Sequence, residues 1–265
     1  MRWETIAPDT CCLCGCAGPM TGEHKMKRAA LQAEFGDRPA VIGRVGERFN
    51  PLQSMKSKRL HFGAKLCEPC NSTRTQKADR CFERLTEAAK AAIRSGQSPG
   101  VVLTEGYFAK SLDDRVAVGQ YLAKLICCHL ADVARVRWTT LSDYALNQTR
   151  EMPCEISLGM DPIFADYKQE IGDHPYAAHG GLVAIWSTSA ESVAGFQSSL
   201  TFGPLRYVFR FNTGLWDRLS LPWNRIDFWR QCRNATLASE QGQADVGDLI
   251  RLGFIESDAN EVGAI

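Results

Sequence analysis

The sequence predicts an α+β protein built in two parts. Apolar residues recur at helical spacing through residues 81–93 and dominate residues 113–134, which predicts two helices. From residue 181 the pattern changes to a period of two, which is typical of strands in an antiparallel sheet. Two C-x-x-C pairs, at residues 11–14 and 67–70, frame the segment before the first helix. We therefore expect a small metal-stabilised unit followed by a mixed helix and antiparallel-sheet unit.

The composition is that of a globular chain. Of its 265 residues, 45% are hydrophobic, which is enough for a sizeable core. The chain has no run of about 18 apolar residues, and its first residues lack the apolar core of a signal peptide. We therefore expect a cytoplasmic protein without membrane contact. Its 11 cysteines are then thiols or metal ligands in a reducing compartment.

Positive charge is concentrated in one segment, although the net charge of the whole chain is only +1. Residues 25–80 hold 13 Lys and Arg against 5 Asp and Glu, whereas the remaining residues hold 18 against 25. A basic segment attracts polyanions such as nucleic acid, and the alternative is an ordinary solvated surface. Because this segment lies between and beside the cysteine pairs, we favour nucleic acid as the partner.

The two cysteine pairs suit a tetrahedral zinc ion, because each C-x-x-C turn aims two thiolates at one point. The second pair is Cys67 and Cys70. The first pair belongs to a run of four thiols that cannot all bind one ion: Cys11, Cys12, Cys14 and Cys16.

Between the pairs lies the dipeptide Glu23-His24, and Asn71 follows the last cysteine directly. This order resembles the treble-clef members of the HNH, or ββα-metal, endonuclease family, including the phage junction-resolving endonucleases. The resemblance covers about residues 8–95. It implies an N-terminal treble-clef domain with a structural zinc. Since Cys14 lies ten residues before His24, the family pattern selects Cys11 and Cys14 as ligands with the second pair. Either Cys12 or Cys16 remains an alternative to one of them.

The resemblance also implies the chemistry of the site. His24 would deprotonate the attacking water, while Glu23 and Asn71 would hold a Mg²⁺ or Mn²⁺ ion on the scissile phosphate. An imidazole is largely neutral at pH 7, and carboxylate and amide oxygens are hard ligands, so these roles are chemically reasonable. We therefore expect a DNA endonuclease from a phage, a mobile element or an antiviral defence system. The alternatives are an enzyme that acts on RNA and a non-catalytic zinc-finger module.

The elements of the first part follow in order. We expect strands at residues 20–24 and 60–66, with His61 on the second, and a helix at residues 72–93. Residues 25–33 contain helix formers, residues 36–50 look irregular, and the whole segment reads as an insertion between the strands. Five cations are candidates for binding the nucleic-acid backbone: Lys25, Lys56, Lys58, Arg59 and Arg74. Arg74, near the start of the helix, is the best candidate for a phosphate clamp.

A linker at residues 95–100, rich in Ser, Gly and Pro, divides the expected domains into residues 1–95 and 101–265. The second domain should contain the helix at 113–134 and strands at 182–186, 197–202 and 205–211. It carries no motif that predicts chemistry. We expect it to set specificity, to contact a partner protein or to form a homodimer.

Overall fold

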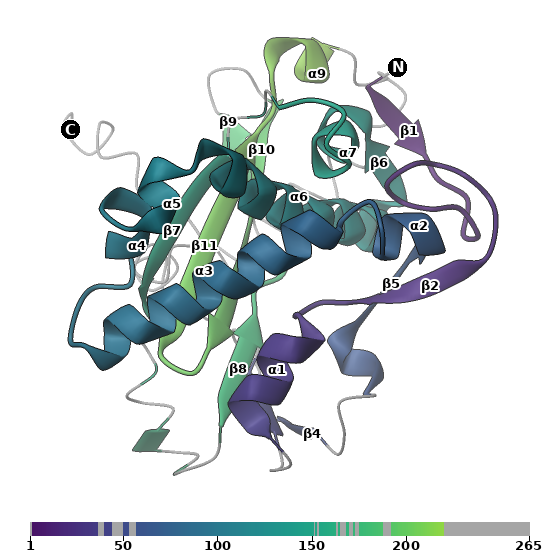
Figure 1. Cartoon of the computed structure of the whole chain (residues 1–265). Helices are drawn as coiled ribbons and strands as arrows, with labels where there is room; N and C mark the ends of the chain where they lie inside the picture. Colours follow the sequence, from purple (N-terminus) through teal and green to yellow (C-terminus); the bar gives the residue numbers. More distant parts are fainter. Residues whose placement is uncertain are drawn as a thin grey trace, which may run out of the picture.

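The computed structural model describes residues 2–36, 40–43, 50–52, 57–150, 152, 154–162, 164, 168–169, 172, 175–187 and 192–219. It confirms the α+β class, with helices beside mainly antiparallel sheets (Figure 1). The helices are α1 (Arg28–Phe35), α2 (Glu68–Asn71), α3 (Gln76–Arg94), α4 (Val101–Thr104), α5 (Tyr107–Lys110), α6 (Leu112–Ala134), α7 (Thr139–Ala145) and α9 (Leu215–Leu219), with a 3₁₀ turn η1 (Lys58–Leu60). The strands are β1 (Trp3–Thr5), β2 (Met20–His24), β3 (Ala40–Gly43), β4 (Asn50–Leu52), β5 (His61–Cys67), β6 (Val136–Trp138), β7 (Cys154–Met160), β8 (Tyr176–His179), β9 (Val183–Ser187), β10 (Ser192–Phe202) and β11 (Leu205–Asn212).

The largest sheet runs in the order β4-β3-β8-β10-β11-β7, and β9 pairs with β10 beside β8. The strands β10 and β11 form its centre, because they pair along eight residue positions across the turn at Gly203. Gly203 has a φ of +58°, in the left-handed region that favours glycine, and a Cβ there would meet only the flexible end of the Glu34 side chain of α1. The backbone conformation at Gly203 therefore allows the tight turn of the central hairpin.

Part of the segment between β2 and β5 joins this sheet. Within residues 36–50, which the sequence suggested were irregular, residues 40–43 form β3 and Asn50 begins β4, while residues 37–39 and 44–49 lie outside the described residues. The strand β3 pairs in parallel with β8 and antiparallel with β4. A four-residue strand that follows a proline and ends in a glycine has little local signal, and β3 pairs with a strand 135 positions later in the sequence.

Two long helices connect the cysteine-rich part to the sheet. In α3 the apolar residues repeat at helical spacing, and the buried ones include Phe82 and Leu85. In α6 every residue from Ala117 to Ala131 is buried, and Ser111 caps its first turn by accepting from the amide of Asp114. The two helices pack against each other, and α3 crosses in front of the sheet in Figure 1. By length and hydropathy α6 would be long enough to span a membrane, but 83% of the qualifying window is buried in the protein, as in a core helix.

Residues before and after the linker at residues 95–100 pack into one hydrophobic core. Phe82 of α3 stacks on Tyr121 of α6 with ring centroids 4.1 Å apart, and the hydroxyl of Tyr207 on β11 donates to Thr86 at 2.9 Å. The linker residues from Ser95 to Ser98 are exposed. The division into two domains remains a prediction, and the described part of the chain shares packing across it.

Candidate functional site

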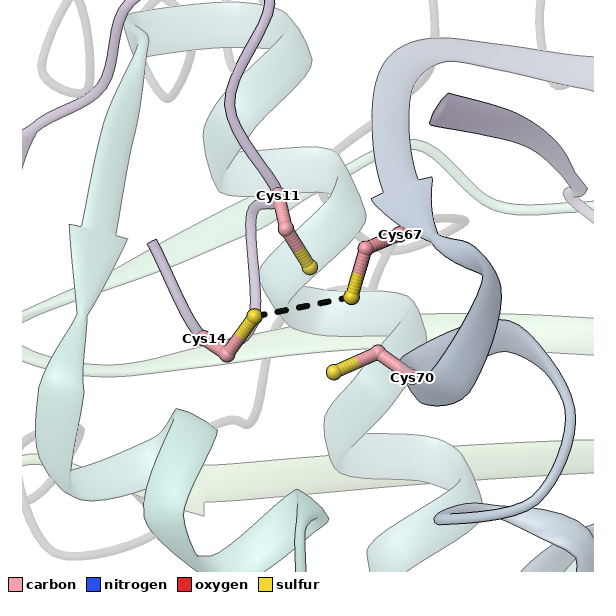
Figure 2. A group of neighbouring side chains, drawn as sticks. All are labelled: Cys11, Cys14, Cys67 and Cys70. Atoms are coloured by element: carbon pink, nitrogen blue, oxygen red, sulfur yellow. Dashed lines mark hydrogen bonds between the residues drawn. The ribbon is translucent and has the colours of Figure 1, made fainter. Parts of the chain in front are cut away.

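Four cysteines converge at one end of the two-stranded antiparallel sheet of β2 and β5, which we call the hairpin. Cys11 and Cys14 lie in the turn before β2, whereas Cys67 ends β5 and Cys70 lies in α2. Their sulfur atoms are all within 4.8 Å of one another and point towards a common centre (Figure 2). Sulfur atoms bound to one tetrahedral zinc at about 2.3 Å are about 3.8 Å apart. The measured 3.6 Å between the sulfurs of Cys14 and Cys67 fits that spacing, so the cluster could hold zinc.

Backbone hydrogen bonding closes the turn that carries Cys11 and Cys14. The amide of Gly15 donates to the carbonyl of Cys11 at 2.8 Å, with Gly15 at a φ of +72°. A left-handed residue at this point lets the turn close over the two sulfurs. Hydrogen bonding from the Cys70 thiol lowers the pKa of the Cys11 thiol to about 4, which favours the thiolate that metals bind.

The other two cysteines of the N-terminal run take different places. Cys12 is fully buried, and its sulfur lies 3.7 Å from that of Cys128 on α6, away from the cluster. Cys16 is exposed, and its sulfur lies 2.9 Å from that of Cys14. Among the described residues, Cys16 is therefore the alternative ligand that stays close to the cluster.

The turn at residues 72–75, which follows α2, packs back on the cluster. Arg74 Nη1 lies 3.5 Å from the Cys70 sulfur, and the Arg74 amide donates to Pro69. Ser72 and Thr73, at the start of the helix predicted at residues 72–93, donate to carbonyls of the preceding turn. The long helix consequently begins at Gln76. Arg74 is thus placed to stabilise a thiolate, and its role as a phosphate clamp stays a prediction.

The two strands of the hairpin pair irregularly beside the predicted base. Gly22 pairs with Lys65 and His24 pairs with His61, so two steps along β2 correspond to four along β5. The extra length of β5 forms a bulge opposite Glu23.

Asp132 of α6 holds this bulge. Its carboxylate accepts from the amide of Gly63 at 3.0 Å and from the amide of Ala64. A Cβ added at Gly63 would meet the Asp132 carboxylate at 3.1 Å, so glycine permits the close approach. The irregular register is therefore stabilised from outside the hairpin.

This register brings two imidazoles together. The rings of His24 and His61 have centroids 3.9 Å apart and are tilted by 44°. Burial lowers the pKa of His24 to about 4, and a protonated His61 and the positive charge of Arg28 act in the same direction. Burial also lowers the pKa of His61, assisted by Lys65. Both imidazoles are therefore neutral at pH 7. The sequence pattern singled out His24 as the candidate base, but nothing in the sequence indicated its contact with His61.

Asn71 is tied to the same hairpin. Its Nδ2 donates to Thr21 Oγ1 at 2.9 Å and to the carbonyl of Gly22 at 3.2 Å. Its Oδ1 makes no hydrogen bond to any residue that the structure describes. The hydrogen bonds to β2 thus orient the Asn71 amide, and its oxygen remains available to accept or to coordinate.

Glu23 points towards the helices. Its Oε1 lies 3.0 Å from Nζ of Lys124 on α6, and the same ammonium lies 3.0 Å from Oδ1 of Asp79 on α3. Burial raises the pKa of Glu23, against the opposing charge of Lys124. Burial alone would lower the pKa of Lys124, but the two carboxylates outweigh it and raise that pKa. Sequence reasoning missed Lys124 and Asp79. The available signal was a single lysine inside the apolar run of α6.

The predicted backbone-binding cations are only partly described. Lys58 lies exposed in η1 and Lys25 is half-buried after β2, whereas Lys56 lies outside the described residues. The side chain of Arg59 is also outside the described set. Arg28 and Lys65 are exposed, their charges act on His24 and His61 respectively, and they were not among the predicted contacts.

Comparison of the chain with models of protein families, with curated proteins and with solved structures finds no match in any of the three.

Proposed function

We propose that the chain is a metal-dependent endonuclease of the HNH type that hydrolyses DNA. The observation that carries the proposal is the bond from the Asn71 amide to the carbonyl of Gly22, two residues before His24. A predicted base and a predicted metal ligand, 47 positions apart, are thereby linked beside the cysteine cluster. Reading the hairpin and α2 as a treble clef belongs to the same proposal.

The remaining oxygen atoms suit a hard cation such as Mg²⁺ or Mn²⁺. Asn71 keeps Oδ1, and Glu23 keeps Oε2, which has no hydrogen-bond partner among the described residues. Such an ion is commonly held by one or two protein oxygens together with substrate phosphate. When bound, it would polarise the scissile phosphate as a Lewis acid. Glu23 and Asn71 are the residues that would hold it.

His24 would accept the proton of the attacking water. With a pKa of about 4 it is in the basic form throughout the neutral range, so we expect the cleavage rate to fall only as the pH approaches 4. His61 lies against its ring and would hold its orientation. Four thiolates fill every position of a tetrahedral zinc and leave none for water, so that ion would stabilise the fold alone.

The substrate would approach from the exposed cations near the histidine pair. The charge of Arg28 acts on His24 and that of Lys65 acts on His61, and Lys58 is close in sequence to His61. Together with the excess of positive charge in residues 25–80, they favour a phosphate backbone.

The test is a comparison of two variants on a DNA duplex. His24→Ala should lower the cleavage rate by about 10²–10⁴-fold with unchanged zinc content, because only the proton acceptor is lost. Asn71→Ala should lose activity through weaker metal binding, so excess Mn²⁺ should restore part of it. His179→Ala, a histidine of β8 outside the hairpin, serves as the control. Rescue of the histidine variant but not of the asparagine variant by excess metal would reverse the assigned roles.

A second candidate is a non-catalytic zinc-finger module that binds nucleic acid or protein. The contact between Glu23 and the buried Lys124 favours it, because a carboxylate paired with an ammonium is a poorer metal ligand. Wild-type cleavage on DNA, measured in parallel on RNA, separates this module from either nuclease. A zinc-loaded wild type that cleaves neither substrate makes the module the better account, whereas variants that cut at the wild-type rate would remove the assigned roles from His24 and Asn71.

A further inference from the structure

Lys124 is a charged side chain in the interior of the protein. Only 2% of its side chain is exposed, and it projects from the middle of the most buried helix. Its ammonium lies 5.3 Å from the centroid of the Tyr121 ring and 3.0 Å from each of two carboxylates. A buried ammonium is costly unless it is paired, so these contacts fix its position.

The two carboxylates that share this ammonium differ in their other partners. Asp79 also lies 3.6 Å from Lys27, which in turn pairs with Glu83 at 3.3 Å. Within the described residues, Glu23 has Lys124 as its single ion-pair partner. Lys124 is therefore the cation that faces Glu23 from α6, while Asp79 draws the same ammonium towards α3.

A fixed ammonium next to a carboxylate changes how that carboxylate binds metal. A unit positive charge a few ångströms from a divalent ion repels it. Even with the full dielectric screening of water, this lowers the affinity by about tenfold. In a partly buried site the screening is weaker and the effect is larger.

We propose that Lys124 is a positioning residue, an internal cation that holds the Glu23 carboxylate and keeps the affinity of the free protein for divalent metal low. The inference rests on the proposed function only in taking Glu23 as a metal ligand. It assigns a role to α6, from the second part of the chain, in a site formed by the first.

The experiment measures Mn²⁺ binding to the zinc-loaded full chain by electron paramagnetic resonance, without nucleic acid. Lys124→Met keeps an unbranched side chain, one heavy atom shorter, and removes its charge. We expect it to bind Mn²⁺ at least about tenfold more tightly than the wild type. Adding Glu23→Gln to this variant should abolish the gain. A folded Lys124→Met protein whose Mn²⁺ affinity is unchanged or weaker would overturn the proposal.

A second pair of variants covers the case in which Lys124→Met does not fold. Asp79→Asn leaves the ammonium to Glu23 alone, so Mn²⁺ should bind more weakly than to the wild type. Glu83→Gln is the matched control, because it removes one negative charge from the same network without touching Lys124. Equal weakening in both variants would overturn the proposal, since general charge would then explain the effect.

The Mn²⁺ binding experiment and the DNA cleavage assay can fail independently. If the wild type cleaves DNA but Lys124→Met gains no affinity for Mn²⁺, this inference fails and the function stands. If Lys124→Met gains Glu23-dependent affinity while the wild type does not cleave, the inference stands and the function fails.

Discussion

Cys16 lies close enough to the cysteine cluster to compete for a metal ion bound there. Its sulfur is 2.9 Å from that of Cys14, and the side chain is exposed. Cys12, the neighbour that spacing alone could not exclude, is instead turned towards Cys128 on α6. The geometry therefore favours the ligand set Cys11, Cys14, Cys67 and Cys70.

A serine scan of these thiols tests the ligand set. Cys67→Ser should reduce the zinc content from one ion per chain towards zero and unfold the hairpin, because metal binding supplies folding energy. Cys16→Ser should keep one zinc, because its thiol is a neighbour and not a ligand. Metal analysis with thermal melting provides the measurement. Loss of zinc from Cys16→Ser, with zinc retained in Cys14→Ser, would show that Cys16 is the ligand.

Side chains with a distinctive spacing were predictable at this scale, and their supporting partners were not. The cysteine pairs and Glu23-His24 form a pattern that can be recognised in one dimension. Lys124 contacts Glu23 from 101 positions away, and no local rule connects two such positions. Buried ion pairs depend on tertiary packing, so sequence shows only that a charge lies in an apolar helix.

The hairpin of β2 and β5 depends on an element outside itself. Asp132 of α6 accepts two amide hydrogen bonds from the bulge at Gly63 and Ala64. The bulge sets the register in which His24 faces His61. The helix thus contributes to the geometry of the histidine pair through the bulge.

Replacing Asp132 should change the titration of His24. In Asp132→Ala the two amides lose a charged acceptor, which should destabilise the exposed bulge by about 1–2 kcal/mol. The pKa of His24 should then rise from about 4 towards its ordinary value near 6.5, because the ring is less buried and less close to His61. Nuclear magnetic resonance titration of the imidazole gives the readout. Asp113→Ala, on the same helix but exposed and paired with Arg150, is the control. An unchanged His24 pKa in Asp132→Ala would separate the bulge from the histidine pair.

The sequence predicted the long elements well and the short ones poorly. The segments predicted at 113–134 and 205–211 correspond to α6 (Leu112–Ala134) and β11 (Leu205–Asn212), because strong periodicity persists over many residues. The strands β3 and β4 have four and three residues, and they exist through pairing with distant partners. At residues 138–180 the sequence has no sustained helical or strand periodicity, and the described part of this stretch contains α7, β7 and β8.

In the whole molecule, α6 is the common support of the two parts. Along this one helix, Lys124 reaches β2, Cys128 reaches the cysteine turn and Asp132 reaches β5. The same helix packs on α3 and contacts β10 of the main sheet. The predicted second domain therefore supplies supporting contacts to the site, alongside whatever specificity or partner role it has.

The central claim is that this assembly cuts a phosphodiester backbone. The most direct measurement is nicking of supercoiled plasmid by the zinc-loaded full chain, with Mg²⁺ added or omitted and with zinc content checked in each sample. The account predicts nicked circles with Mg²⁺ and none without it, and no nicking by His24→Ala under either condition. A fully zinc-loaded wild type that leaves both plasmid and RNA intact in Mg²⁺ and in Mn²⁺ would contradict the claim.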